Sequence, residues 1–244
     1  MLPGIINSKR CGDNLREKNI VIVAVDGPAG SGKSSVCADA CRRMGWTYIN
    51  TGFLYRAVAY IAVGEQLDFA VGQQMESVAK RFIDNYRWSP DEQRLIFEGE
   101  DITDHLYSSE VGTAASCVAK CGVVRDLLLP VQRDLALCAS NGAIVDGRDI
   151  GTVVFPDADL KVFMTASIEE RAKRRFSQLE LSQKNQVSLD IIKSEILLRD
   201  KQDSERGVAP LKQAADAITF DTSSITLEAS VLGLIDLLKS KNLC

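Results

Sequence analysis

Short apolar runs alternate along the chain with longer stretches in which apolar residues recur every three or four positions. The runs predict strands, and the longer stretches predict helices. The predicted strands are Ile20–Val25, Trp46–Ile49, Ala143–Asp146, Leu160–Met164 and Ala217–Phe220. The predicted helices are Lys33–Met44, Thr51–Ala62 with Thr51 as its cap, 111–120, 124–140, one opened by the capping box Ser167–Glu170, 188–203 and Leu227–Lys239. This alternation predicts an α/β fold, in which a parallel sheet carries helices on both faces.

The rhythm changes between Gly64 and Gly112, where Tyr86–Trp88 and Arg94–Phe97 read as strands joined by a turn at Ser89–Asp91. We expect an inserted α+β subdomain at about 64–112, within a single domain of residues 20–244 whose core is 20–63 and 113–244. Residues 1–19 are polar and of mixed charge, which predicts a flexible tail rather than a signal peptide.

Composition narrows the class of protein. The chain has 244 residues, 45% of them hydrophobic and 25% charged, and no apolar run is long enough to span a membrane. A net charge of −4 argues against a general nucleic-acid binder. Seven cysteines, an odd number, do not suggest a disulfide framework, and the pairs Cys37/Cys41 and Cys117/Cys121 indicate buried reduced thiols of a cytoplasmic protein. His105 is the only histidine, which counts against Ser-His-Asp and Cys-His catalysis.

The segment Gly27–Ser34 fits the pattern G-x-x-x-x-G-K-[ST] and lies between a predicted strand and a predicted helix. Glycines let the backbone approach phosphates, and the N–H groups at the helix start attract anions. Lys33 is predicted to reach the β- and γ-phosphates of ATP, and Ser34 to bind Mg²⁺. The predicted nucleotide-binding residues are Gly27, Pro28, Ala29, Gly30, Ser31, Gly32, Lys33, Ser34 and Ser35.

Charged residues outside this loop indicate which reaction the bound nucleotide undergoes. Arginine suits phosphate because its planar fork donates two parallel hydrogen bonds, although most surface arginines only solvate a helix. Asp146 follows a predicted buried strand, so it is expected at the ligand-binding edge of the sheet, as a second Mg²⁺ ligand or as a turn residue. Asp149 could accept hydrogen bonds from a base or pair with Arg148.

Several segments resemble one family in the same order. Asn50–Arg56 is similar to D-[ST]-G-x-x-Y-R, and Asp146–Ala158 to D-G-R-D-[MI]-G-T-V-V-F-P-x-A. Ser167–Arg175 resembles the start of the family's lid, and Arg199–Leu211 its R-D-x-x-D-x-x-R…APL segment. On these residues the chain resembles the bacterial cytidylate kinases, from about Ile20 to the last helix, with departures at Asn50, Thr51 and Gln202.

The resemblance implies a P-loop fold with a lid at about 167–190, and transfer of the γ-phosphoryl of ATP to CMP or dCMP with Mg²⁺. The insertion would be the monophosphate-binding subdomain. The residues it implies for the acceptor are Thr51, Tyr55 and Arg56 in the monophosphate pocket, Arg56, Arg148 and Arg206 on its phosphate, Ser116, Arg125 and Asp149 on cytosine, and Arg199 and Asp203 near the sugar. The lid arginines Arg171 and Arg174 or Arg175 would close over ATP, so the catalytic set is Lys33, Arg148, Arg206, Arg171, Arg174 and Arg175.

Other interpretations stay open at this level. The acceptor could be UMP, AMP or shikimate, although Asp149 beside donors favours cytosine. A nucleotide-binding switch would need switch loops and an N-K-x-D element, which are not found, and the phosphate loop disfavours a pure interaction protein. We expect small-molecule nucleotides as the partners, and a monomer.

Overall fold

The computed structural model describes residues 20–89, 92–178 and 187–244. The predicted tail, the middle of the predicted turn at 89–91 and part of the predicted lid lie outside these residues. The described residues divide into two compact units, one of 20–22 with Gly45–Val145 and one of Val23–Met44 with Asp146–Cys244. Each unit is described by itself.

The main sheet is parallel, as the apolar runs predict. Its five strands have the order β2-β6-β1-β7-β8. The strands are β1 (Val21–Asp26), β2 (Thr47–Asn50), β6 (Gly142–Gly147), β7 (Leu160–Thr165) and β8 (Ile218–Asp221). In the second unit β1 pairs with β7, with Val23 opposite Leu160, and β7 pairs with β8, with Val162 opposite Ile218. The middle of β1 is fully buried, which explains its continuous apolar run.

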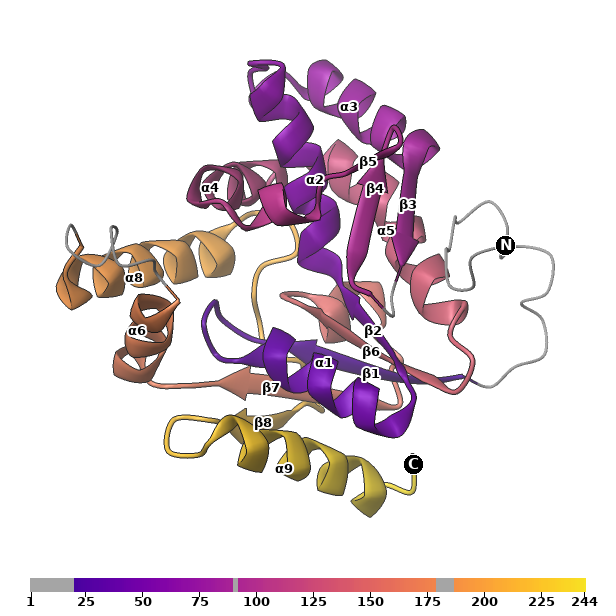
Figure 1. The fold of residues 1–244 in the computed structure, drawn as a ribbon, viewed down its shortest axis with the longest axis vertical. Coiled ribbons are helices and arrows are strands. Elements are labelled where there is room, and N and C mark those ends of the chain that lie inside the picture. The colour runs from indigo at the N-terminus through magenta and orange to yellow at the C-terminus, as the bar shows by residue number, and fades with distance from the viewer. Residues whose placement is uncertain (1–19, 90–91, 179–186) are drawn as a thin grey trace. The chain divides into compact units, whose positions relative to one another are not determined.

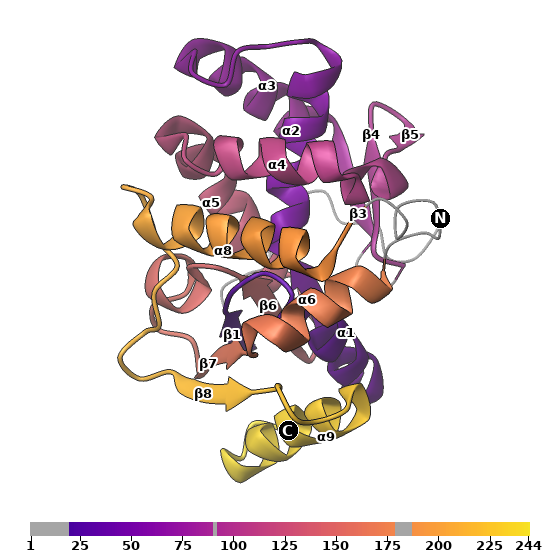
Figure 2. The same cartoon turned by 90° about the vertical axis from the view of Figure 1, so that its left-hand side faces the viewer.

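Helices of the second unit cover these strands. They are α1 (Lys33–Met44), α6 (Ile168–Ser177), α8 (Leu189–Glu205) and α9 (Leu227–Ser240). Helix α9 packs against α1 and lies along β8 (Figures 1 and 2), where a Cβ on Gly233 would come within 3.0 Å of the Phe220 ring. Helix α6 packs against α8 through a small cluster of Ala172, Ile192 and Ile196.

Some helix ends follow the predicted signals and others do not. The helices predicted at 111–120 and 124–140 are observed at Ser109–Val118 and Gly122–Leu137, so both begin two residues earlier than predicted. The predicted bounds of α1 are those observed, and Gly45 has a φ of +67° after its last turn. Ser167 accepts a hydrogen bond from the Glu170 N–H, as a capping residue does. The prediction that Thr51 caps the next helix is wrong, because Asn50 occupies the cap position and Thr51 is the first helical residue.

The first unit is built on helix packing and a small antiparallel sheet. Its helices are α2 (Thr51–Gly64), α3 (Gly72–Asn85), α4 (Ser109–Val118), α5 (Gly122–Leu137) and the short η2 (Thr103–Tyr107). Its three-stranded sheet contains β3 (Tyr86–Ser89), β4 (Arg94–Phe97) and β5 (Glu100–Asp101). Helix α2 packs against α4 and α3 (Figure 2), and α3 packs against α5. The predicted strands at Tyr86 and Arg94 are therefore confirmed.

Cysteine chemistry differs in part from the prediction. Cys37 and Cys41 are buried free thiols, whereas Cys117 is exposed and Cys121 is half-buried. Burial raises the pKa of Cys37, which keeps its thiol protonated. Cys138, which belongs to neither predicted pair, is in a disulfide bond. Within the described ranges, no helix has both the length and the apolar character needed to cross a membrane.

Candidate active site

The loop between β1 and α1 has the backbone that its glycines predict. Gly27 has a φ of +150°, and a Cβ there would lie 1.9 Å from the Met164 carbonyl oxygen on β7. No other residue fits that position, because a side chain would clash with backbone. Helix α1 begins at once, and the Val36 N–H donates to the Gly32 carbonyl at 3.0 Å. The loop therefore ends on a helix N-terminus, as an anion site requires.

Lys33 lies inside this loop. Its Nζ donates to the carbonyl oxygens of Gly27 and Pro28 at 2.8 Å each and to Ser31 Oγ at 3.3 Å. Only 4% of the residue is exposed, and burial, helped by the Arg148 charge, lowers the pKa of Lys33 to about 7. The buried ammonium is costly by itself, and a phosphate bound in the loop would stabilise it.

The lowered pKa of Lys33 predicts how stability depends on pH. The folded protein holds this proton less tightly than the unfolded chain, whose lysine has a pKa of 10.5, so unfolding takes up a proton between about pH 7 and 10.5. The contribution of Lys33 to the free energy of unfolding therefore rises with pH across that window. Relative to Lys33→Met, the nucleotide-free wild type should gain about 2–3 kcal/mol between pH 7 and 9.5. Denaturant unfolding of both proteins at the two pH values measures this, and a difference that does not change with pH would contradict it.

Ser34 and Asp146 come together at the end of the sheet. Ser34 is exposed at the start of α1, and its Oγ donates to Asp146 Oδ2 at 2.7 Å. Asp146 is buried near the end of β6, the strand beside β1 in the sheet. The structure thus unites the two residues predicted to bind a metal, although they are far apart in sequence. A hydroxyl and a carboxylate are oxygen donors of the kind Mg²⁺ prefers.

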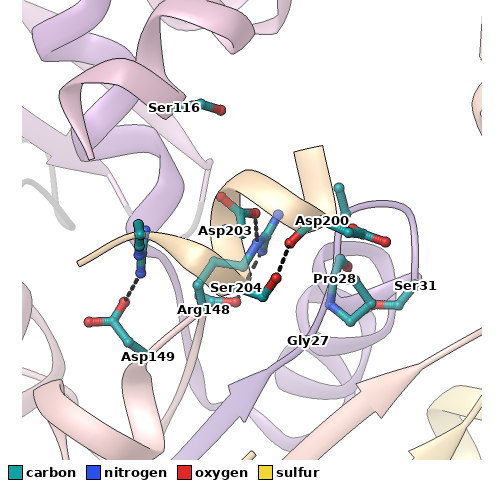
Figure 3. A network of polar contacts seen from close by, with 12 residues as sticks. Gly27, Pro28, Ser31, Ser116, Arg148, Asp149, Asp200, Asp203 and Ser204 are labelled. Carbon is teal, nitrogen blue, oxygen red and sulfur yellow. Dashed lines mark hydrogen bonds and ion pairs between the residues drawn. The ribbon is translucent and has the colours of Figure 1, made fainter. Parts of the chain in front are cut away.

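Two arginine–aspartate pairs join the loop after β6 to the end of α8 (Figure 3). Arg148 Nε donates to Asp203 Oδ2 at 2.9 Å, and Arg206 Nη2 donates to Asp149 Oδ1 at 3.2 Å. Arg206 and Asp149 are both more than nine-tenths buried. Burial acts to lower the pKa of Arg148, but the nearby carboxylates of Asp203 and Asp146 raise it above its usual value. All four residues were predicted to bind the acceptor, and the structure places them in one network.

Arg171 lies on α6 and contacts the phosphate loop from outside. Its Nη1 donates to the Ala29 carbonyl at 3.2 Å and to Asp200 Oδ2 of α8 at 2.6 Å. The residue is buried, so its guanidinium holds together the loop, α6 and α8. Its predicted place over the phosphates of ATP remains a prediction.

Arg174, one helical turn further on, also binds the loop. Its Nη1 donates to the Ser31 carbonyl at 3.2 Å, and its Nη2 donates to the Thr222 carbonyl at 2.6 Å. Thr222, directly after β8, also donates from Oγ1 to the Ser31 carbonyl at 2.9 Å. Arg175 is exposed. Thr222 belongs to no motif, and sequence reasoning missed it.

The first unit holds the other predicted acceptor residues. Thr51, Tyr55 and Arg56 lie on α2, Ser116 on α4 and Arg125 on α5. The buried Arg125 guanidinium lies over the Tyr55 ring, 5.5 Å from its centroid.

Arg56 and Ser116 are held on the α2–α4 side of the same unit. Arg56 Nη1 donates to the Leu106 carbonyl at 2.5 Å, and its guanidinium packs on Gly112 of α4, where a Cβ would lie 3.3 Å away. Ser116 Oγ donates to the Gly112 carbonyl at 3.4 Å. Helix packing thus unites residues spread over more than seventy positions of sequence. Arg199, on α8 of the second unit, is half-buried.

Asp26 was also missed by sequence reasoning. It is the last residue of β1, and its carboxylate accepts from the Ile150 N–H at 2.8 Å and the Gly151 N–H at 2.7 Å. Burial raises the pKa of Asp26 to about 6 against the effect of those two bonds. The sequence signal that could have indicated Asp26 is the position of an acidic residue between a predicted apolar strand and the glycine loop.

These features together define a phosphotransferase of the P-loop kinase class. They are a parallel sheet, a glycine loop around a buried lysine, an acid on the adjacent strand and a set of arginines. The comparisons make this more specific. The family model of cytidylate kinase matches residues 23–240. The chain belongs to the cytidylate kinase family.

Curated relatives agree over most of their length. A cytidylate kinase of Pseudomonas paraeruginosa is 43% identical over 88% of this chain and 94% of its own. A cytidylate kinase of Azotobacter vinelandii is 41% identical over 91% of this chain and 97% of its own length. A cytidylate kinase of Exiguobacterium sp. is 43% identical over 88% of this chain and 94% of its own length. The similarity therefore spans both units of the structure.

Proposed function

We propose that this protein transfers the γ-phosphoryl group of ATP to CMP or dCMP, giving CDP or dCDP and ADP, in pyrimidine nucleotide metabolism. The observation that carries the proposal is the network around the phosphate loop, in which Lys33 lies within the loop and Arg148 and Asp149 follow the adjacent strand. Membership of the cytidylate kinase family supports the same acceptor. We also propose a cytoplasmic location and a monomer.

ATP would bind on the loop from Gly27 to Ser35. The N–H groups at the start of α1 would face its phosphates, and Lys33 would exchange loop carbonyls for the β- and γ-phosphate oxygens. Arg171 and Arg174 already hold the carbonyls of Ala29 and Ser31. From these places they would fix the shape of the loop, and they or Arg175 would add positive charge when the lid closes.

Mg²⁺ would be held by Ser34 and Asp146. These residues fit the ion, because Mg²⁺ in kinases takes a few oxygen ligands from the protein and the rest from phosphates and water. Among the described residues there is no cluster of three or more acidic, Cys or His side chains that could form a closed metal cage, which agrees with a site completed by the nucleotide. When bound, the ion neutralises charge on the phosphates.

The acceptor would be recognised by its phosphate and its base. Arg148, Arg206 and Arg56 would bind the phosphate, with Thr51 and Tyr55 beside it. Cytosine has an N4 donor next to acceptors at N3 and O2. The carboxylate of Asp149 would accept from N4, while Ser116 and Arg125 would donate to the acceptors. Arg199 and Asp203 would lie near the sugar.

Catalysis would consist of positioning and charge neutralisation. The acceptor phosphate has a second pKa near 6, so its attacking oxygen is already ionised at neutral pH and needs no general base. That oxygen bonds to the γ-phosphorus as the bond from the γ-phosphorus to the β–γ bridging oxygen breaks, and ADP leaves. Lys33 and the arginines would stabilise the negative charge, and a closed lid would exclude water.

A phosphotransfer assay tests the proposal. Purified protein, ATP and Mg²⁺ are mixed with CMP, dCMP, UMP, AMP or shikimate in turn, and both ADP and the phosphorylated acceptor are measured. We expect CMP and dCMP to react with kcat/KM at least about 10²-fold above the other acceptors, because a buried polar site rejects the wrong base strongly. Omission of Mg²⁺ should remove the signal. A preference for another acceptor, or ADP release without a phosphorylated product, would refute the assignment.

A further inference from the structure

Asp26 makes contacts that the proposed reaction does not explain. It is 4% exposed, and both of its carboxylate oxygens are used on backbone N–H groups of one segment, Ile150 and Gly151. A buried carboxylate is destabilising unless hydrogen bonds offset its desolvation, and here burial still raises the pKa of Asp26 to about 6. An apolar residue at the end of β1 would avoid this cost. The carboxylate is therefore retained for what it does to that segment.

The segment is a short π-helical turn, Ile150–Val154, which begins directly after Arg148 and Asp149. Within the turn, the N–H groups of Val153 and Val154 donate to the Asp149 carbonyl at 2.9 and 3.2 Å, and the Phe155 N–H donates to the Ile150 carbonyl at 2.7 Å. The first N–H groups of any helical turn have no partner within it. In this turn the carboxylate of Asp26, at the end of β1, accepts hydrogen bonds from the N–H groups of Ile150 and Gly151.

Asp149 occupies the N-cap position of this turn, whose side chain normally accepts a hydrogen bond from the first N–H groups. It is the cap residue of the turn, and aspartate is among the best capping residues, yet its side chain makes no cap hydrogen bond. Its carboxylate binds Arg206 instead. Asp26 thus does the capping that Asp149 would otherwise do, which leaves the Asp149 carboxylate directed away from its own turn.

The space around these bonds is closely filled. A Cβ on Gly151 would lie 3.4 Å from Asp26 Oδ2 and 3.1 Å from Cδ of Lys161. The Lys161 ammonium is bound to Asp216, at 2.8 Å, so it does not take up the Asp26 carboxylate. A side chain at position 151 would therefore be crowded by Lys161, whereas 3.4 Å from the carboxylate oxygen is an ordinary van der Waals distance.

We propose that Asp26 is a positioning residue for the acceptor: by capping the Ile150–Val154 turn in place of Asp149, it keeps Asp149 and the adjacent Arg148 oriented for CMP. This inference rests on the proposed roles of Arg148 and Asp149. Without Asp26, the Asp149 carboxylate would turn back onto the N–H groups of its own turn, as capping aspartates do.

The test is Asp26→Asn, assayed with CMP and UMP at varied ATP. An amide keeps one acceptor but sets an NH₂ group against the second N–H, so one bond is lost. We expect KM for CMP to rise about tenfold or more and the preference for CMP over UMP to fall by a similar factor, with KM for ATP changed less than about twofold. The matched control is Asp68→Asn, which makes the same change at an exposed aspartate that accepts a hydrogen bond from the Ala70 N–H, in the other unit of the structure. It should leave all three quantities unchanged.

The double variant Asp26→Asn with Asp149→Asn separates positioning from a general loss of structure. If Asp26 acts through Asp149, adding Asp26→Asn to Asp149→Asn should cause little further loss of the preference for CMP over UMP. Additive losses, or an Asp26→Asn protein that loses kcat alone at unchanged KM for CMP, overturn the proposal. If Asp26→Asn does not fold, Asp26→Glu keeps the charge but moves the carboxylate by one methylene from the N–H groups of Ile150 and Gly151, and an unchanged KM for CMP in that variant overturns the proposal.

Failure of the proposed function would look different. A wild-type protein that does not prefer CMP to UMP contradicts the assigned acceptor. An unchanged preference in Asp149→Asn alone contradicts the assigned role of Asp149. Either result contradicts the proposed function, on which the inference rests. If the wild type prefers CMP to UMP and Asp26→Asn keeps the same preference and the same KM for CMP, the inference about Asp26 is wrong.

Discussion

Replacement of Lys33 by Met should lower kcat by about 10³-fold, with the protein still folded. The Nζ of Lys33 is held by two loop carbonyls at 2.8 Å, inside the loop on which we propose that the phosphates of ATP bind. Met fills a similar volume without the charge, and the loss is therefore one of electrostatic stabilisation. Steady-state kinetics with CMP at saturating ATP measures it.

Stability supplies the check on this result. Because burial lowers the pKa of Lys33 to about 7, the ammonium is destabilising in the folded protein, and its removal should not lower the melting temperature at neutral pH. Lys80→Met makes the same change at a lysine of α3 that is paired with Glu76 and largely exposed, and it should keep full activity. Lys33→Met with kcat within tenfold of wild type would exclude the proposed role of this lysine.

Arg148→Lys should lower kcat/KM for CMP by about 10²–10³-fold. Lysine keeps the charge, but it cannot donate to Asp203 from the Nε position and has no planar fork for a phosphate. The loss is expected on the acceptor side, so KM for ATP should change by less than about threefold. Lysine also leaves a cation near the buried Asp203, which limits any loss of stability.

Arg42→Lys is the matched control for Arg148→Lys. Arg42 lies on the exposed side of α1 and pairs with Asp39 one turn before it, so its replacement should not alter kcat or either KM. Equal losses in both variants would indicate a general effect of the substitution. Full activity of Arg148→Lys would show that the guanidinium fork has no role in binding or transfer.

Local signals predicted the parts of the fold that depend on neighbouring residues. The end of α1 at Met44 and the cap at Ser167 are set by a glycine and a capping box in the sequence itself. The cap of α2 was misplaced by one residue, because both Asn50 and Thr51 can occupy such a position and tertiary packing decides between them. Helix α3 was expected only as part of a mixed insertion.

The candidate site was predictable as a set of residues but not as a set of contacts. The phosphate loop and the Asp146–Asp149 segment stand out in sequence, so Ser34 and Asp146 could be proposed together. The bond from Asp26 to the turn at Ile150 joins positions 124 residues apart, and no local pattern records it. Thr222 was missed for the same reason. Contacts between distant strands and loops depend on the completed sheet.

Three of the predicted phosphate-binding arginines of the second unit are already paired with carboxylates. Arg148 is paired with Asp203, Arg206 with Asp149 and Arg171 with Asp200. Figure 3 shows the pair of Arg148 and Asp203. An incoming anion must compete with these carboxylates, and a displaced buried carboxylate is itself costly. Sulfate or free phosphate brings nothing to offset that cost, whereas a nucleotide brings a sugar and a base. If these arginines bind the nucleotide as proposed, the protein would stay receptive to it in a cell rich in simple inorganic anions.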